Sequence, residues 1–359
     1  MSATETVTTL TLEPTSTKSV RTYKDAPGIV VTKTKSVPNE LIEAASATLY
    51  LHPHGDWRDQ LIRDGYAVIK AAIPKQKARE YQQKAFGWMK SFGNDRLDFL
   101  DPETWKKENL PPVDVNINVY NCYGVTHEKF MWDARMEPGV LGAFEKLWNT
   151  DQLLASFDGL NVTLPNRKDA QRKSPWPHFD QSPYKAGLHC VQGIISLSDH
   201  GPEDGGLVVY KGSHNLFNEF FSTQIRKEDW DEFNYYQLSD EQLQWFLDHG
   251  CEEVKVNCEA GDLVVWDSRT CHWGMEPTEK SNTVRTVIYS CFTPAKFASE
   301  EALSKKKELF ENFSGTTHWP HADLTAVRNP THTNVERTGP LEKPVMTDKL
   351  LKLAGAKPY

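Results

Sequence analysis

Residues 188–210 read LHCVQGIISLSDHGPEDGGLVVY, which is two apolar runs separated by a polar turn. Both runs are rich in valine, isoleucine and leucine, and both are short, so they are predicted to be buried strands. The sequence Asp204-Gly205-Gly206 between them is a turn signal. These two strands are therefore expected to belong to a β-rich core.

Similar strand-like runs occur on both sides of this stretch. The further candidates are residues 66–73, 154–164, 253–257, 262–267 and 283–292. Helical periodicity is found elsewhere, in residues 74–92, 138–148, 239–249 and 300–313. The third of these helices starts with a Ser-x-x-Gln capping box at Ser239 and is followed by Gly250.

The order of these elements indicates the fold class. Helices come first and many short strands follow, which differs from the alternating strand–helix order of a doubly wound fold. This order is typical of a β-sandwich or jelly-roll core with helices packed outside it. The sequence therefore predicts a mainly β protein with flanking helices.

The chain is predicted to form one domain with an extension at each end. Residues 1–38 are polar and threonine-rich and read as a flexible tail. Residues 39–313 contain the regular pattern and are expected to form a single domain. Residues 314–359 are rich in proline and are expected to be a C-terminal extension that packs on the domain or trails from it.

Composition excludes several classes of protein. The chain has 359 residues with 41 basic and 49 acidic side chains, a formal charge of -8, so it lacks the basic footprint of a nucleic-acid or anionic-membrane binder. No apolar stretch has the length of a membrane span, and the N-terminus does not read as a secretory signal. The six cysteines form no Cys-x-x-Cys pair and are expected to be reduced thiols in a cytoplasmic protein.

The triplet His178-Phe179-Asp180 is the first candidate for chemistry. Residues i and i+2 of an extended segment point to the same face, so an imidazole and a carboxylate can bind one ion. On its own the triplet is weak evidence, because most such triplets lie in surface turns.

A second histidine strengthens the metal interpretation. His272 follows the apolar run Asp262 to Asp267, and two histidines with one carboxylate form the facial triad of non-haem Fe(II) oxygenases. Arg285 lies in the otherwise apolar strand 283–292, where a buried guanidinium needs a partner. That partner is either an acidic side chain of the sheet or a dicarboxylate co-substrate such as 2-oxoglutarate, which would bind in a bidentate manner.

Four motifs together resemble the phytanoyl-CoA dioxygenase family of Fe(II)/2-oxoglutarate-dependent oxygenases. They are His178-x-Asp180, the stretch from Asp204 to His214, the stretch from Gly261 to His272, and Arg285. The resemblance covers residues 60 to 295. It implies a double-stranded β-helix, a jelly-roll and cupin-like core, in which His178, Asp180 and His272 ligate iron and Arg285 binds the distal carboxylate of 2-oxoglutarate.

The chain departs from this family pattern at two positions. Gly274 stands where relatives often have a serine or threonine that helps to hold the co-substrate, and Lys211 stands where many have proline. Gln192, on the strand after the triplet, is a candidate for the missing co-substrate contact. No catalytic residue is predicted beyond the metal centre.

The expected reaction couples oxidation of a small organic substrate, by hydroxylation, to decarboxylation of 2-oxoglutarate by O2, giving succinate and CO2. Specialised metabolism is a plausible setting for such a reaction. Two alternatives remain at this stage. One is a cupin-like isomerase or hydrolase with another metal, and the other is a non-catalytic jelly-roll binding protein. Succinate formation and metal content separate the three.

Two further histidine motifs have more than one interpretation. Gly212-Ser213-His214 lacks the Gly-x-Ser-x-Gly spacing of a hydrolase nucleophile and is predicted to form a turn and a helix start. The cluster His318-Trp319-Pro320-His321 either contacts substrate or lies on the surface. The pattern alone does not decide between these two placements.

Overall fold

The computed structural model describes residues 29–31, 37–51, 53–93, 96–113, 118–330, 333 and 335–359. Most of the predicted N-terminal tail, residues 1–28 and 32–36, lies outside these described residues. The part of the tail that is described, Ile29–Val31, forms strand β1. No helix among the described residues has both the length and the apolar character needed to cross a bilayer.

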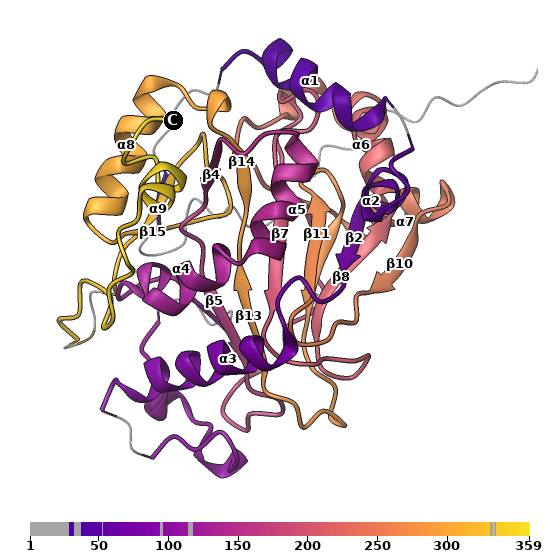
Figure 1. Ribbon diagram of the computed structural model, residues 1–359. Coiled ribbons are helices and arrows are strands. Elements are labelled where there is room, and N and C mark those ends of the chain that lie inside the picture. The colour runs from indigo at the N-terminus through magenta and orange to yellow at the C-terminus, as the bar shows by residue number, and fades with distance from the viewer. Residues whose placement is uncertain are drawn as a thin grey trace, which may run out of the picture.

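Two antiparallel sheets form the centre of the molecule (Figure 1). The six-stranded sheet has the order β2 (Tyr66–Ile69), β11 (Leu263–Asp267), β7 (Val191–Ser196), β13 (Arg285–Tyr289), β5 (Leu160–Thr163) and β3 (Val119–Tyr120). The five-stranded sheet has the order β10 (Glu252–Lys255), β8 (Gly206–Lys211), β12 (His272–Met275), β6 (His178–Phe179) and β9 (Tyr236–Gln237). From β5 to β8, and again from β10 to β13, consecutive strands of the chain alternate between the two sheets, as in a double-stranded β-helix.

Successive side chains of a strand point to opposite faces of the sheet, so the two faces contact different apolar clusters. In β11, Val264 and Trp266 join an apolar cluster with Leu207 and Val209 from the opposite sheet, so this cluster lies between the sheets. Their neighbour Val265 packs with the larger cluster on the other face. The six-residue strand β7 is buried throughout because both of its faces are covered.

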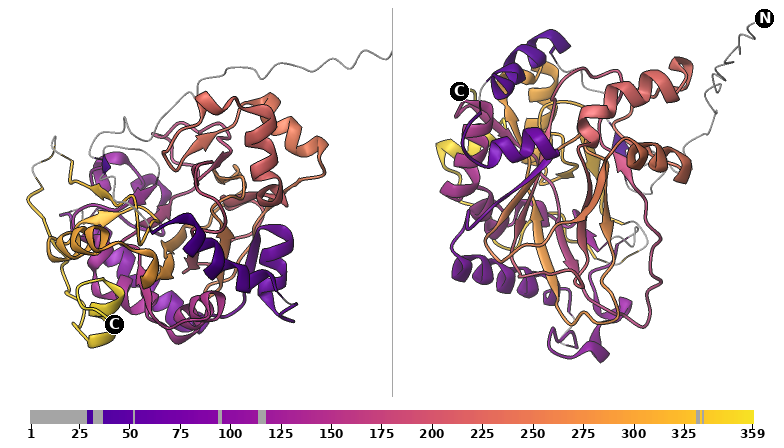
Figure 2. Two further views of the ribbon diagram at one scale, coloured as in Figure 1. Left: turned by 90° about the horizontal axis from the view of Figure 1, so that it is seen from above. Right: turned by 90° about the vertical axis from the view of Figure 1, so that its right-hand side faces the viewer.

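Helices cover the outer face of each sheet (Figure 2). The helices α3 (Lys75–Lys90), α4 (Lys129–Arg135) and α5 (Pro138–Trp148) contribute to the larger cluster beside the six-stranded sheet. The helices α6 (Ser213–Gln224) and α7 (Asp240–Asp248) pack phenylalanine side chains against the five-stranded sheet. The mainly β fold with flanking helices is therefore confirmed.

Helix α2 (Trp57–Asp64) ends at Gly65, which has a left-handed φ of 82°. Two of the predicted helices are found at the expected places. The capping box of α7 is complete, because Ser239 and Gln242 each accept a backbone N–H of the other. Helix α8 (Glu300–Glu311) lies within the predicted range.

Two predicted strands are each divided in the structure. Residues 154–164 form β4 (Leu153–Ala155) and β5, and residues 283–292 form β13 and the start of β14 (Phe292–Pro294). The pairing explains the division, because β5 pairs with β13 in the six-stranded sheet while β4 pairs with β14 in a separate two-stranded sheet. An apolar run does not reveal that its two halves have different partners.

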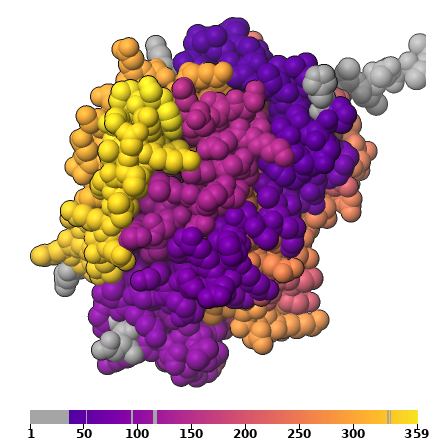
Figure 3. Space-filling view, in the orientation of Figure 1, coloured from indigo at the N-terminus to yellow at the C-terminus, as the bar shows by residue number. Residues whose placement is uncertain are grey.

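The C-terminal residues pack on the rest of the chain. Strands β15 (Gly315–Thr316) and β16 (Thr325–Val327) form a three-stranded sheet with β1. After helix α9 (Asp348–Leu353), the hydroxyl of Tyr359 donates to the carbonyl of Leu153 at 2.6 Å. Figure 3 shows this yellow C-terminal segment lying directly against earlier parts of the chain.

Helix α8 carries a buried cation. Lys306 is 1% exposed, and its Nζ donates to the carbonyl of Ala155 at 2.5 Å and lies 4.0 Å from the ring centre of Phe157. Burial and, to a smaller extent, the charge of the nearby Arg135 lower the pKa of this lysine from 10.5 to about 7. The unfolded chain therefore binds more protons than the folded chain between about pH 7 and the ordinary lysine pKa.

We expect this difference to make stability rise with pH. Because the folded pKa of Lys306 is depressed, its share of the unfolding free energy increases above pH 7, by up to about 1.4 kcal/mol per pH unit. Lys306→Met should remove that slope, whereas Lys307→Met, at an exposed neighbour, should keep it. Urea unfolding between pH 7 and 9.5 measures both variants, and equal slopes in wild type and Lys306→Met would contradict the assignment.

Candidate active site

Two neighbouring strands bring three predicted ligands together. Strand β6 pairs with β12 so that His178 lies directly opposite His272, and Asp180 follows β6 at once. One donor atom from each of the three side chains lies within 4.8 Å of the others. The Nε2 atom of His178 is 3.5 Å from Oδ1 of Asp180, and Nε2 of His272 is 3.2 Å from Oδ2. All three residues are buried.

Backbone carbonyls orient both imidazoles. Nδ1 of His178 donates to the carbonyl of Trp176 at 3.0 Å, and Nδ1 of His272 donates to the carbonyl of Thr270 at 2.9 Å. The proton of each neutral ring is therefore on Nδ1, and the lone pair of each Nε2 faces Asp180. Two imidazole nitrogens and one carboxylate directed at one point are the donor set of a non-haem iron site, so the residues fit the metal.

The protonation states suit metal binding. Burial lowers the pKa of His178, so this imidazole stays neutral below its usual range. Burial alone would raise the pKa of Asp180, but the neighbouring imidazoles of His178, His318 and His272 favour the ionised carboxylate and bring its pKa well below the usual value. A neutral imidazole and an ionised carboxylate are the forms that ligate metals.

Gln192 contacts the metal-binding group from the sheet behind it. It lies on β7 opposite Trp266, and its Nε2 donates to Oδ2 of Asp180 at 3.0 Å. The residue is buried. The structure thus places this predicted co-substrate contact against the carboxylate of the triad, where it fixes the orientation of Asp180.

Aromatic rings enclose the triad. Trp176 stacks on His178 with ring centres 4.4 Å apart and planes 5° apart, and Tyr235 lies 5.0 Å from the same imidazole. Trp266 lies 5.4 Å from His272. A Cβ added at Gly274 would meet only Trp176, at 3.9 Å. Trp176 and Tyr235 were missed in the sequence, although the position of Trp176 two residues before His178 was a usable signal.

Arg285 is a buried cation without a charged partner. It is 4% exposed, its Nη1 donates to Oδ1 of Asn161 at 3.3 Å, and its Nε has no partner. Among the described residues it forms no ion pair, so the alternative of an acidic partner in the sheet is not found there. A Cβ at residue 206 would lie 2.9 Å from Nε, so Gly206 provides the space for the guanidinium.

Neutral polar groups line the space around this arginine. Asn161 accepts from Thr163 at 2.9 Å and donates to the hydroxyl of Tyr289 at 3.4 Å. Tyr289 also interacts with Arg285, which lies four residues earlier on β13. A buried guanidinium surrounded only by neutral groups is costly unless an anion joins it. The arrangement therefore fits the distal carboxylate of a dicarboxylate co-substrate.

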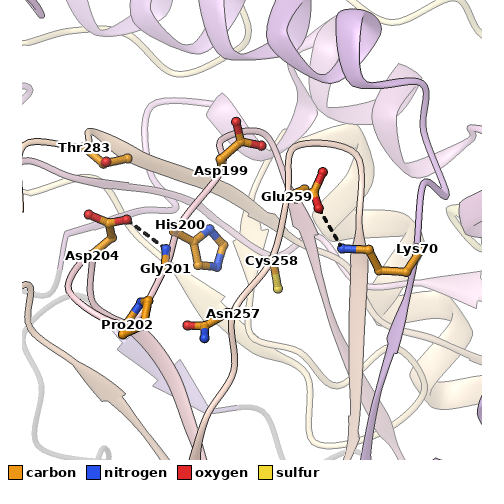
Figure 4. A pocket seen from close by; sticks show the side chains of 10 residues that line it. All are labelled: Lys70, Asp199, His200, Gly201, Pro202, Asp204, Asn257, Cys258, Glu259 and Thr283. Carbon is orange, nitrogen blue, oxygen red and sulfur yellow. Dashed lines mark hydrogen bonds and ion pairs between the residues drawn. The ribbon is translucent and has the colours of Figure 1, made fainter.

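A separate pocket of about 410 Å³ is lined by none of the five predicted site residues (Figure 4). Its walls carry both charges, including Asp199, Asp204, Glu259 and Lys70. Asp204 accepts the backbone N–H of Gly201, and Glu259 pairs with Lys70 at 3.5 Å. These polar groups satisfy one another, so the pocket does not compete with the triad as the reaction site.

The fold and the site define a class of protein. A jelly-roll core with two imidazoles and a carboxylate around one point, and a buried arginine nearby, is the arrangement of a non-haem Fe(II)/2-oxoglutarate-dependent oxygenase. The chain belongs to the phytanoyl-CoA dioxygenase family, because the model of that family matches residues 61–281. This match contains the triad and ends before Arg285.

Comparisons with individual proteins agree with this family. The chain is 42% identical to Ava biosynthesis cluster protein O of Aspergillus versicolor, over 76% of this chain and 89% of that protein. It is 22% identical to a putative phytanoyl-CoA dioxygenase of Dictyostelium discoideum, over 59% of this chain and 68% of that protein. The crystal structure of hypothetical protein JW0805 from Escherichia coli at high pH is similar in fold, with a TM-score of 0.54, 18% identity, and coverage of 88% and 90% of the two chains.

The protein is therefore an oxidoreductase that uses Fe(II), 2-oxoglutarate and O2. The predictions of the family, the fold, the enzyme class and these cofactors are confirmed. The reaction couples oxidation to the consumption of 2-oxoglutarate. The roles of individual side chains in that reaction are argued below.

The contact between Gln192 and Asp180 leads to a prediction about metal affinity. Gln192→Leu removes the hydrogen bond but keeps a similar volume, so Asp180 loses one fixed orientation. We expect Mn(II), a redox-stable probe, to bind about 10-fold more weakly, since partners of metal ligands contribute factors of this size. Titration followed by electron paramagnetic resonance measures the affinity. Unchanged binding would mean that the backbone alone orients Asp180.

Proposed function

We propose that His178, Asp180 and His272 bind Fe(II) and that Arg285 binds the distal carboxylate of 2-oxoglutarate. The observation that carries this proposal is the pair of fixed Nε2 lone pairs directed at Asp180. The unpaired guanidinium of Arg285 supports the position of the co-substrate. Tyr289 and Asn161 would complete the carboxylate site, in place of the hydroxyl that Gly274 lacks.

The bound iron would supply O2 activation, coupled to decarboxylation of the co-substrate to succinate and CO2. The side chains of the protein prepare the site for this chemistry. His178, Asp180 and His272 would hold the ion through two imidazole nitrogens and one carboxylate. Gln192 holds Asp180, and Trp176, Tyr235 and Trp266 enclose the centre and limit the entry of water.

We further propose that the enzyme hydroxylates a small organic molecule of specialised metabolism. The relative that is 42% identical takes its name from a biosynthesis cluster, which supports this setting. The carboxylate of Asp180 occupies the position that a halogenase of this type leaves to a halide ion. The aromatic rings around His178 suit a substrate with an apolar surface.

The ligand roles can be tested without knowing the substrate. Wild-type protein titrated anaerobically with Fe(II) and 2-oxoglutarate should develop the weak visible charge-transfer band of the chelated complex. His178→Ala and Asp180→Ala each remove a ligand, so the band should be lost. His249→Ala is the matched control, because His249 is exposed and its ring stacks on Trp245 in α7. A full band in Asp180→Ala would overturn the ligand assignment.

The co-substrate site predicts a graded loss of 2-oxoglutarate affinity. Arg285→Ala removes a buried charged partner and should weaken binding at least about 30-fold. Tyr289→Phe removes one neutral hydrogen bond and should weaken it about 2- to 10-fold. The same anaerobic titration measures both effects.

Pyruvate provides the control for this measurement. It carries the chelating 2-oxo acid group but lacks the distal carboxylate. Wild type and Arg285→Ala should therefore bind pyruvate with similar affinity. If Arg285→Ala weakened pyruvate and 2-oxoglutarate equally, the arginine would act through the fold and not through the carboxylate.

A further inference from the structure

The residue that follows Asp180 has a buried side chain with partners at both ends of its amide. Gln181 is 0% exposed. Its Nε2 donates to the carbonyls of Lys185 and Gly187, both at 3.0 Å, and its Oε1 accepts from Oγ of Ser268 at 2.8 Å. An amide is stable in the interior of a protein only when its polar atoms are paired. These three hydrogen bonds therefore hold the side chain of Gln181 in one position.

Gln181 also closes the loop that leads away from the ligand. The two carbonyls that accept from its Nε2 lie four and six positions further on, so loop 181–187 folds back on this side chain. Gly187 has a left-handed φ of 78°, and a Cβ there would lie 2.9 Å from Cγ of Glu43 in helix α1 (Asn39–Ala47). The loop is thus compact and packs closely against α1.

Ser268 joins this loop to the segment that leads to the second histidine. It is 0% exposed and lies between β11 and β12, four residues before His272. Its carbonyl accepts the N–H of Asp180 at 3.1 Å, and its own N–H donates to the carbonyl of Cys190 at 3.1 Å. Its Oγ donates to Gln181. Ser268 therefore contacts the segment of Asp180 through both its backbone and its side chain.

The pairing between β6 and β12 alone gives the ligands little support. Strand β6 is two residues long, and its register with β12 contains a single pair, His178 opposite His272. Asp180 lies beyond this pair, and its N–H is bonded to Ser268. The hydrogen bond between Gln181 and Ser268 joins the same two segments at this point, so it can fix where the carboxylate of Asp180 lies relative to the imidazoles.

We propose that Gln181 and Ser268 are positioning residues of the metal centre, and that the hydrogen bond between them holds Asp180 in place relative to His272. This inference rests on the proposed function, since it assumes that Asp180 and His272 ligate the metal. Both side chains bond other parts of the protein, so they act through the ligand segments and not on the ion. Partners that fix the ligands of a metal raise its affinity.

Metal affinity provides the test, with Mn(II) and Co(II) as probes. Ser268→Ala removes the hydroxyl and keeps the backbone contacts, and Gln181→Leu removes the amide with little change in volume. Each should weaken Mn(II) binding about 10-fold, as measured by electron paramagnetic resonance titration. Each should also shift the visible absorption of the Co(II) complex, which reports ligand geometry.

The double variant Ser268→Ala/Gln181→Leu tests whether the two residues act together. If the hydrogen bond between them carries the effect, the double variant should bind Mn(II) as weakly as Gln181→Leu alone, whereas independent effects would multiply. Ser222→Ala in α6 and Gln244→Leu in α7 are the matched controls, because both side chains are exposed, and both variants should bind like wild type. Thermal unfolding of each variant, recorded without metal, separates a local effect from a general loss of stability.

The outcomes distinguish this inference from the proposed function. Failure of wild type to bind Mn(II) or Co(II) would overturn the metal assignment itself. If wild type binds, an unchanged affinity or an unshifted Co(II) spectrum in either single variant would overturn the positioning role alone. Losses that multiply in the double variant would contradict the joint action of the two residues. Should Gln181→Leu be unfolded without metal, Ser268→Ala decides the question, because it removes only one hydroxyl.

Discussion

The register between β6 and β12 is the constraint on which the site depends. It places His178 opposite His272, and Asp180 continues the same strand, so two short segments supply the whole donor set. A shift of one residue would turn every side chain of a strand to the opposite face of the sheet. The register is kept by the apolar layers on both faces, where Phe179 packs outward against α6 and α7. The metal site is thus a consequence of core packing.

Charge balance is the second constraint. It distinguishes Arg285 at the candidate co-substrate site from Arg269, which has an acidic partner. Arg269 is partly buried and pairs with Asp267 at 2.6 Å, so its charge is balanced. Arg285 is buried and has no acidic partner among the described residues, and the lone pairs of two imidazoles converge on one carboxylate. A buried guanidinium without an acidic partner is expected to bind an anion. Three metal-binding side chains that converge on one point are expected to bind a metal ion. This difference supports the proposal that the co-substrate extends from the triad to Arg285.

The sequence predicted the site more completely than the strand pairing. A charged or metal-binding side chain inside an apolar strand is rare unless it has a partner. This rule drew attention to His178, Asp180, His272 and Arg285. The division of residues 154–164 between two sheets could not be found, since both halves are apolar and the difference lies in their partners. Gln192 was selected for its position, but its contact with Asp180 depends on how β7 and the ligand turn face each other.

The C-terminal segment shows why the local sequence pattern does not predict contacts between distant parts of the chain. His318 and His321 are three residues apart in a proline-containing stretch without periodicity, yet they reach different environments. His321 is fully buried and hydrogen-bonds Thr293, as a packing residue does. His318 is only partly buried, and its carbonyl accepts from Sγ of Cys190 at 3.8 Å. The ion pair between Lys185 and Asp323 joins this segment to the loop that follows Asp180. Such a contact between residues far apart in the chain places the segment against the core, and the local sequence pattern does not contain that information.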